Sequence, residues 1–480
     1  MKNNGLFVLV FAAAVCSAFA GDYCLLAAPP EFAFMIEKNL APYVPTHYKT
    51  SGDNYYVDAM HGNDQSGNGS RAKPWKSITK AVNALGPGSY PNVTVNVLPG
   101  TYTENLTLSG LGGNEAGWLV FRSSKPNAAK IVSQYIEGTK PSPTPQNIET
   151  LDYSKYILFD GFEMTGTAQP YVTGCGFQFF RCNHITILNS IIHDVGGAGI
   201  GGIFSDYFTV EGNIVYNTAG YNSSGTSGID FYEPIAADHL SGFHNVISNN
   251  ISFDNSEIDD GRMPHSEGHG IMCDDFDDSQ KAQADGPYAE QTLIQNNISF
   301  NNGGEGIAVY FGNYVTIRNN TTYHNLQDKL INYDTGEIAV SEGSYDEVLN
   351  NIAVTDTNNR SGCLNYALFD SYAYGSKQNV GNEWHNNISF NGTMGQSSVG
   401  GISTRFPITA DSANILGADP KFKNPPVGIA PQAAKTLTGD FSLQPVSPAI
   451  RSGTTAYGAP TTDFRGKSQT SPPSIGAFSR

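Results

Sequence analysis

Basic residues and long apolar runs are both scarce in this chain of 480 residues. Lysine and arginine together number 27, against 44 aspartates and glutamates, which gives a formal net charge of −17. A nucleic-acid partner requires a basic surface, and this composition does not provide one. After the first 20 residues, no apolar run has the length of a membrane helix. We therefore expect neither a nucleic-acid partner nor a membrane span in the processed protein.

Cysteine is also sparse, with six residues in the whole chain. Cys16 lies among the first 20 residues, which leaves five, and an odd number cannot be fully paired. Cys175 and Cys182 are the nearest pair in sequence, and an oxidising compartment would permit a disulfide between them. The spacing is equally compatible with a disulfide and with two separate thiols.

The first 20 residues have the pattern of a secretory signal peptide. Lys2 provides a positive start, residues 6–14 form an apolar run, and Ala-Phe-Ala at 18–20 is a small-residue cleavage site. The processed protein is therefore expected to be secreted and extracellular, and we expect it to be a monomer. Asn-X-Ser/Thr sequons are common in the chain, and Asn222, in a loop, is the best candidate for a glycosylated residue of a glycoprotein.

One feature is abundant, a short β-prone phrase that begins with asparagine and recurs seven times. The recurrences lie about 23 residues apart, or at that spacing plus an insertion, which is typical of a parallel β-helix with one coil per repeat. In such a solenoid, the asparagine at each bend can bond the asparagine of the next coil and the neighbouring backbone. We therefore predict an all-β solenoid with one continuous core. The phrases begin at Asn189, Asn213, Asn250, Asn297, Asn320, Asn351 and Asn387.

This pattern divides the processed chain into four segments. Residues 21–52 are an irregular N-terminal extension that contains prolines. Residues 53–92 form an N-terminal cap, in which residues 74–85 are predicted to be an amphipathic helix covering the open end of the coil. Residues 93–430 form the β-helix, and residues 431–480 are a C-terminal segment of strands and turns that closes its far end.

A second repeat, a glycine followed by a strand, brings acidic side chains onto one outer sheet. Because side chains alternate along a strand, Asp230 and Asp274 are predicted to point outward on neighbouring coils. Asp274, Asp275 and Asp278 belong to the densest acidic run in the chain. Hard oxygen ligands at this spacing suit calcium, so we expect these four aspartates to bind Ca²⁺.

Two insertions, residues 217–245 and 254–268, interrupt the repeat around the same sheet, and long loops on a rigid scaffold commonly build functional sites. Proton abstraction from a uronate would require a base whose pKa is lowered beside bound cations. Basic residues near this sheet are few, and Lys329 is the best-placed candidate, with Lys281 and Arg262 as alternatives. In the two coils after the acidic run, no lysine occupies an outward strand position.

Four motifs near the start of the pattern carry a family resemblance. They are Tyr-Tyr-Val-Asp at 55–58, Gly-Asn-Asp at 62–64, Pro-Trp-Lys-Ser-Ile at 74–78 and Pro-Gly-Thr-Tyr at 99–102. Together they resemble the opening of right-handed parallel β-helix proteins related to the ninth family of polysaccharide lyases, which includes the pectate lyases. The resemblance extends over residues 55–400, and it implies a right-handed parallel β-helix with an N-terminal capping helix.

In that lyase family, an aspartate on an earlier coil and an Asp-Asp-x-x-Asp run hold calcium, and a lysine is the base. Asp230 and the run Asp274-Asp275-x-x-Asp278 match the ligand positions. The resemblance therefore implies a secreted lyase that binds an acidic polysaccharide and cleaves it by calcium-assisted β-elimination. The metal would also offset the repulsion between an acidic protein and an acidic polymer.

Three other functions share these features. A glycoside hydrolase could use Asp230, Asp274 and Asp275 as its acid and base. Gly-His-Gly at 268–270 also occurs in β-helical galacturonan hydrolases, but there it lies a coil beyond the Asp pair, whereas here it comes first. We therefore expect His269 to be a turn residue. A non-catalytic carbohydrate-binding surface protein and an epimerase acting at carbon 5 are the remaining alternatives.

Overall fold

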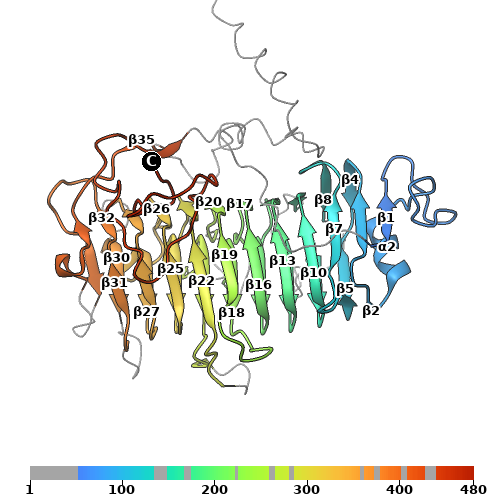
Figure 1. Cartoon of the computed structure of the whole chain (residues 1–480), viewed down its shortest axis with the longest axis horizontal. Coiled ribbons are helices and arrows are strands. Elements are labelled where there is room, and N and C mark those ends of the chain that lie inside the picture. Colours follow the sequence, from blue (N-terminus) through green and yellow to red (C-terminus); the bar gives the residue numbers. More distant parts are fainter. Residues whose placement is uncertain are drawn as a thin grey trace, which may run out of the picture.

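The computed structural model describes residues 52–133, 149–166, 174–221, 225–258, 265–280, 286–356, 362–371, 379–401, 408–426 and 439–480. Here the chain winds into a right-handed parallel β-helix, in which each full coil adds one strand to each of three long sheets (Figure 1). The predicted fold class is confirmed. The predicted signal peptide and nearly all of the N-terminal extension lie outside these ranges, and within them no helix is long and apolar enough to cross a membrane.

Sheet 1 has 13 strands, and its inward side chains stack from coil to coil in the core. Phe121 and Phe159, on adjacent coils, stack with 5.1 Å between their ring centroids. The strands are β1 (Asn54–Val57), β2 (Gly88–Ser89), β3 (Thr94–Val97), β6 (Leu111–Gly112), β7 (Leu119–Ser123), β10 (Lys155–Asp160), β13 (Asn183–Leu188), β16 (Asp206–Glu211), β19 (Phe243–Ser248), β22 (Gln291–Gln295), β25 (Val315–Arg318), β28 (Glu347–Leu349) and β31 (Glu383–His385).

Sheet 2 has 11 strands, and most of them lie within the asparagine phrases, where each strand begins shortly after the asparagine. They are short, because the chain bends again within three or four residues. The strands are β4 (Gly100–Thr103), β8 (Ala129–Val132), β11 (Phe162–Thr165), β14 (Ile191–His193), β17 (Ile214–Tyr216), β20 (Ile251–Phe253), β23 (Ile298–Phe300), β26 (Thr321–Tyr323), β29 (Ile352–Val354), β32 (Ile388–Phe390) and β34 (Ile415–Leu416).

Sheet 3 has ten strands and contains the glycine phrases. Outside the three sheets, β35 (Phe422–Asn424) and β36 (Asp440–Leu443) pair antiparallel, and residues 410–412 form a short 3-10 helix. The strands of sheet 3 are β5 (Leu106–Ser109), β9 (Glu149–Asp152), β12 (Phe177–Phe180), β15 (Ile200–Ile203), β18 (Ile229–Tyr232), β21 (Ile271–Asp274), β24 (Ile307–Tyr310), β27 (Thr335–Ser341), β30 (Asn365–Ser371) and β33 (Val399–Gly401).

Buried asparagines join the coils at the bend that leads into sheet 2. The Oδ1 atom of Asn297 accepts from the backbone N–H and the side-chain amide of Asn250, at 2.9 and 3.0 Å. Its own amide donates to Ile247 O at 2.9 Å and to Asn320 Oδ1 at 3.0 Å. The polar atoms of this buried side chain are therefore satisfied. The ladder consists of Asn213, Asn250, Asn297, Asn320, Asn351, Asn387 and Asn414.

The ladder differs from the prediction at both ends. Asn189 is not a member, because Ser190 holds the equivalent position and its backbone N–H donates to Asn213 Oδ1 at 3.0 Å. Asn189 lies one residue earlier at a φ of 49°, and its amide donates to Asp160 Oδ1 at 2.9 Å. Asn414 extends the ladder one coil beyond the predicted members.

The predicted capping helix is present but is shorter than residues 74–85. Helix α2 (Ile78–Leu85) begins after Ser77, whose side chain accepts a backbone N–H of the first turn at 3.1 Å. Trp75 cannot join the helix, because it forms a β-bridge with β1 and stacks on Tyr55 with 5.2 Å between ring centroids. The helix lies at the β1 end of the coil, as expected of a cap (Figure 1).

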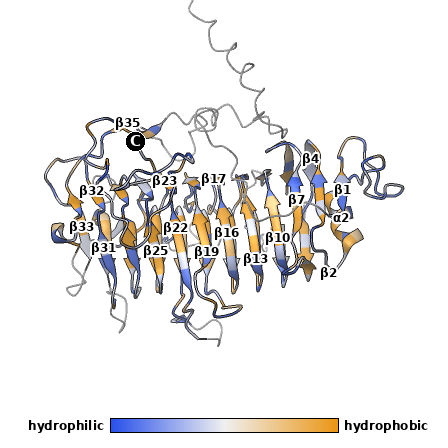
Figure 2. Ribbon diagram, in the orientation of Figure 1, coloured by the Kyte–Doolittle hydropathy of each residue, from blue (hydrophilic) through white to orange (hydrophobic). Residues whose placement is uncertain are grey.

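The C-terminal segment packs along the outer face of sheet 2, whereas we expected it to close the far end of the coil. Phe441 and Ile475 of this segment form one buried cluster with outward residues of the sheet such as Phe300. The amide of Asn319 also donates to Ser474 O at 3.0 Å. The outward residues of sheet 2, such as Ile251 and Ile298, are apolar, so this outer face requires a cover. Figure 2 shows that hydrophobic residues are concentrated in the strands of the coil.

No disulfide joins Cys175 and Cys182, which are both buried thiols. They lie beyond the two ends of β12, a strand of four residues that alone spans about 10 Å. Two cysteines whose Cα atoms are more than about 7 Å apart cannot be bridged without backbone movement. The extended strand between them therefore excludes the disulfide.

Replacing one ladder asparagine should destabilise the fold strongly. Asn297→Ala removes four side-chain hydrogen bonds and takes the partner away from buried groups on Asn250 and Ile247, while Asn320 Oδ1 keeps only the backbone N–H of residue 297. Because each such group costs about 1–3 kcal/mol, we expect a loss of at least ~2 kcal/mol in the free energy of unfolding, measured by urea denaturation. Asn68→Ala, in an exposed turn, is the control and should lose less than ~1 kcal/mol. Equal losses in the two variants would contradict the role of the ladder.

Candidate active site

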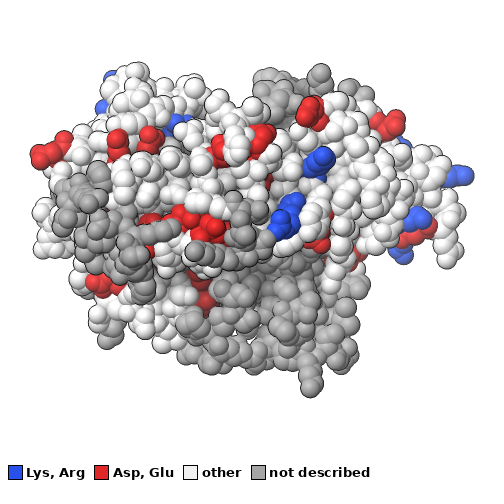
Figure 3. Space-filling model, turned by 90° about the horizontal axis from the view of Figure 1, so that it is seen from below, with Lys and Arg blue, Asp and Glu red and all other residues white. Residues whose placement is uncertain are grey.

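A cleft of about 1230 Å³ lies along the outer face of sheet 3, from β12 to β30. Strand side chains form its floor, and the segments that lead into β21 and β27 contribute to its rim. Figure 3 shows acidic side chains gathered at the middle of the face seen from below, with few basic side chains near them. The C-terminal segment covers sheet 2, whereas the described residues leave this face of sheet 3 open.

Strand alternation brings Asp230 and Asp274 into the cleft. Asp230 and Tyr232 face outward from β18, while Ile229 and Phe231 are buried. In the register between β18 and β21, Tyr232 is opposite Asp274. The two aspartates therefore lie on adjacent strands and on the same face, offset diagonally by two residues, as expected from the alignment of their Gly-Ile pairs.

Asp275 and Asp278 are placed differently. Both lie at positive φ in the turn after β21, and neither lines the cleft. The fully buried carboxylate of Asp275 accepts backbone N–H groups from Ser279 at 2.6 Å and from Gln280 at 2.9 Å. These bonds fix the turn, and among the described residues no three of the four aspartates bring ligand atoms within 4.8 Å of one another. Calcium binding by this set stays a prediction.

The candidate bases do not line the cleft as the structure describes it. Lys329 is exposed on the turn between β26 and β27. Lys281 and Arg262 lie outside the described residues, as does the candidate glycosylation site Asn222. The lining residues that the structure describes include no lysine or arginine.

Sequence analysis missed a buried network on the rim of the cleft, formed by Glu267, His269 and Glu305. His269 Nδ1 forms an ion pair with the Glu305 carboxylate, and its Nε2 lies 3.4 Å from Glu267 Oε2. Thr335 Oγ1 donates to Glu305, and Ser227 Oγ donates to Glu267 at 3.2 Å. His269 is therefore a charged link between two glutamates and not a plain turn residue.

A signal for this network is present in the sequence. His269 and Glu305 each immediately precede a Gly-Ile pair, as Ser227 does, so the coils stack them at one edge of sheet 3. Aligning the residue before each Gly-Ile pair would have placed the three side chains together. Glu267 carries no such signal, because the insertion positions it.

The acidic groups of the cleft differ in protonation. Burial lowers the pKa of His269, but Glu305 and Glu267 outweigh burial and raise it to about 9. Burial raises the pKa of Glu267 to about 8, although His269 opposes the shift. Burial likewise raises the pKa of Asp230 to about 6, again against His269. The pKa of Asp274 lies well above its ordinary value, because of burial and then the charges of Glu267 and Asp230. Asp230, with a pKa of about 6, is therefore mainly ionised at neutral pH, whereas burial and the neighbouring carboxyls favour the proton-bearing form of Asp274.

Aromatic rings line the same cleft. Phe180, Phe204 and Tyr232 form a series with ring-centroid distances of 5.5 and 6.1 Å, and Tyr310 lies farther along the floor. Outward aromatic rings on a flat sheet can stack on the apolar faces of sugars. Sequence analysis did not identify Phe180 or Phe204.

Comparison with known proteins finds one family match and several solved structures with limited similarity. Residues 60–263 match a family described only as a protein of unknown function (DUF1565), and no curated protein matches the chain. A pectate lyase, Pel9A, is 19% identical with a TM-score of 0.47, over 90% of this chain and 98% of its own. A rhamnogalacturonan lyase is 16% identical with a TM-score of 0.40, over 70% and 87%. A lacto-N-biosidase from Eubacterium ramulus is 15% identical with a TM-score of 0.41, over 72% and 62%.

The stability of the protein should fall as the pH rises from 6 to 9. The pKa values of His269 and Glu267 in the folded state, about 9 and about 8, exceed their ordinary values of 6.5 and 4.5. The folded state therefore holds more protons than the unfolded state, and the stabilisation is lost as pH passes through these folded values. We expect Tm, measured by scanning calorimetry, to fall by several degrees in this window.

Two variants show which groups cause that fall in Tm. Glu267→Gln removes a carboxyl that must ionise in a buried position, so its Tm should fall less than that of the wild type. His239→Gln changes a histidine whose side chain is 85% exposed, and should reproduce the wild-type profile. A wild-type Tm that is constant or rises from pH 6 to 9 would show that the network is not protonated as described.

Proposed function

We propose that the chain is a carbohydrate-active enzyme that cleaves glycosidic bonds in the cleft over sheet 3 by acid–base catalysis. One observation carries the proposal: two carboxyls on adjacent strands, Asp230 and Asp274, face one aromatic-lined cleft with different protonation. Glycoside hydrolysis requires such a pair, one carboxylic acid that gives a proton and one carboxylate that acts as base or nucleophile.

The environments of the two carboxyls assign their roles. Asp274 is the general acid, because burial and then the neighbouring carboxyls raise its pKa well above the ordinary value and so favour its proton-bearing form. It donates its proton to the glycosidic oxygen as the bond to the anomeric carbon breaks. Asp230 is the carboxylate, because His269 and the backbone N–H of Ser227 favour its ionised form. It activates the attacking water or bonds to the anomeric carbon itself.

The residues around this pair hold its geometry. The backbone N–H of Ser227 donates to Asp230 Oδ2 at 3.1 Å, and the amide of Gln280 donates to Asp274 Oδ1 at 3.1 Å. His269 keeps a positive charge near the site through its contact with Glu305, which limits the repulsion among the carboxyls. His269 and Glu305 are positioning residues in this scheme.

The dimensions of the cleft favour a polysaccharide or a long oligosaccharide. From β12 to β30 there are six strand intervals, which at about 4.8 Å each amount to roughly 29 Å. Several sugar units fit along this length, with aromatic rings available for stacking. Since the described lining contains several carboxyls and no lysine or arginine, a neutral sugar chain meets less repulsion than a uronate chain.

A calcium-assisted lyase acting on an acidic polysaccharide is the second candidate. It is favoured by the pairing of Asp230 and Asp274 in a cleft whose described lining has no lysine or arginine, because a uronate bound there would require a cation between its carboxylate and the two aspartates. Calcium would supply charge neutralisation and acidify the proton at carbon 5. The described cleft lacks a lysine for the base, so this candidate depends on a residue outside the lining.

A product assay tests the proposal and distinguishes the candidates. Secreted protein is incubated with a panel of neutral and uronate polysaccharides, with and without chelator. New reducing ends without ultraviolet absorbance, formed equally in chelator, are the expected result for acid–base hydrolysis. Products that absorb as unsaturated uronates, lost with chelator and restored by calcium, would show the lyase. Binding without cleavage across the panel would favour the non-catalytic alternative.

Substitutions within and outside the cleft test the residue roles. Asp274→Asn and Asp230→Asn should each lower kcat at least ~100-fold on the best substrate of the panel, with KM changed by less than ~5-fold, because proton transfer is lost and binding is kept. Asp278→Asn and Lys329→Ala lie outside the lining and should retain near-normal kcat. A collapse in Asp278→Asn would instead favour the four-aspartate calcium site, and a collapse in Lys329→Ala would make that lysine the base of a lyase.

A further inference from the structure

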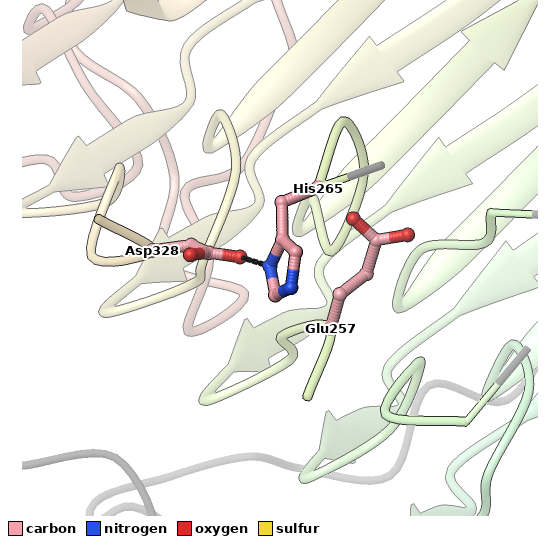
Figure 4. A group of neighbouring side chains, drawn as sticks. All are labelled: Glu257, His265 and Asp328. Carbon is pink, nitrogen blue, oxygen red and sulfur yellow. Dashed lines mark hydrogen bonds and ion pairs between the residues drawn. The ribbon is translucent and has the colours of Figure 1, made fainter. Parts of the chain in front are cut away.

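A separate group of three potential metal ligands lies beside the cleft. One atom each of Glu257, His265 and Asp328 lies within 4.8 Å of the other two. His265 Nδ1 hydrogen-bonds Asp328 Oδ2, and both side chains are 7% exposed. In Figure 4, the imidazole lies between the two carboxylates. Each of the three side chains therefore offers a ligand atom in one small, shielded volume.

One carboxylate oxygen of Glu257 has no hydrogen-bond partner within this group of three residues. The residue is only 7% exposed, and its Oε1 atom is buried without a hydrogen-bond partner. Its Oε2 atom accepts the backbone N–H groups of Ser266 at 2.7 Å and Glu267 at 2.9 Å. A buried carboxylate oxygen with no partner is costly, and a bound cation would remove that cost. This observation is independent of the spacing of the three residues.

The three ligands come from segments that are far apart in sequence. Glu257 and His265 belong to the connection between β20 and β21, and Asp328 belongs to the connection between β26 and β27. The coil between them passes through Gly303 and Gly304, where a Cβ atom would come within 2.4 Å of Ser256 Oγ or 2.3 Å of His269 Nδ1.

The glycines allow the β20–β21 connection to pack directly on the middle coil. The backbone N–H of Gly303 donates to Asn255 O at 2.7 Å, and Gly303 O accepts from the backbone N–H of Asp328 at 3.0 Å. Tyr333 adds a further tie, because its hydroxyl donates to Ser266 O at 2.8 Å. These hydrogen bonds tie the described backbone of both connections to each other and to the middle coil, and such preorganisation favours metal binding.

The donor set selects the kind of ion. Calcium and magnesium prefer oxygen ligands alone, whereas an imidazole nitrogen with two carboxylates suits zinc and similar divalent transition ions. Zinc lies about 2.0–2.2 Å from such ligands, so the three atoms must move slightly to surround it. An ion bound there would replace the direct hydrogen bond between His265 and Asp328.

We propose that Glu257, His265 and Asp328 form a binding site for a zinc-class divalent ion that fastens the β20–β21 connection to the β26–β27 connection. The site is distinct from Asp230 and Asp274 and requires no catalytic step. Because Glu257 also holds the backbone N–H of Glu267, a bound ion would fix the rim of the cleft.

Zinc titration of the full chain tests the site. The protein is treated with chelator, exchanged into buffer and titrated with Zn²⁺ and, separately, Ca²⁺ by isothermal calorimetry. We expect one zinc per chain, a Tm several degrees higher with zinc, and no matching effect of calcium. Glu257→Gln, His265→Asn and Asp328→Asn should each weaken zinc binding at least ~10-fold, because each removes a ligand.

A control variant and a measurement of folding accompany the titration. Glu290→Gln breaks the His239–Glu290 pair, an ordinary histidine–carboxylate contact, and should bind zinc as the wild type does. Circular dichroism in chelator shows which variants fold, and Glu257→Gln keeps an oxygen for the two backbone N–H groups. The absence of zinc binding by the folded wild type at ~100 µM would overturn the proposal. Unchanged binding in the folded ligand variants, or equal binding of calcium, would overturn it as well.

Discussion

The register of the coils depends on buried amide ladders. Each ladder asparagine bonds the backbone of one neighbouring coil and the amide of the next, so a shift by one residue would leave several buried polar groups unsatisfied. Side-chain direction in every strand follows from that register, because residues alternate between core and surface. A second ladder of Asn255, Asn302 and Asn325 ends on the buried Glu337 and fixes the bend before sheet 3. The register set by these ladders therefore places Asp230 and Asp274 on one open face.

The outer faces of the three sheets differ in what covers or lines them. The C-terminal segment covers sheet 2, and rings stack along sheet 1, where Tyr156, His184 and Tyr207 follow one another at 4.2 and 4.3 Å between centroids. Sheet 3 keeps an open cleft with partly exposed carboxyls. The same repeat therefore builds a structural face and a site, and the difference lies in the outward residues and the insertions.

The repeat, the ladder and the outward direction of Asp230 could be predicted from the sequence, because they depend on local spacing and alternation. The rest depends on tertiary contacts. Asp275 belongs to the predicted acidic run, yet its carboxylate fixes a turn, which no spacing reveals. The role of Glu267 depends on how an insertion folds, and Cys175 and Cys182 are separated by an extended strand.

The most direct test of the central claim is a crystal structure of Asp274→Asn with an oligosaccharide of the best polysaccharide substrate. Our account predicts sugar units along sheet 3, with the glycosidic oxygen beside residue 274, the anomeric carbon facing Asp230 and a ring stacked on Tyr232 or Tyr310. An oligosaccharide bound instead along the rings of sheet 1, with the cleft over sheet 3 empty, would contradict it.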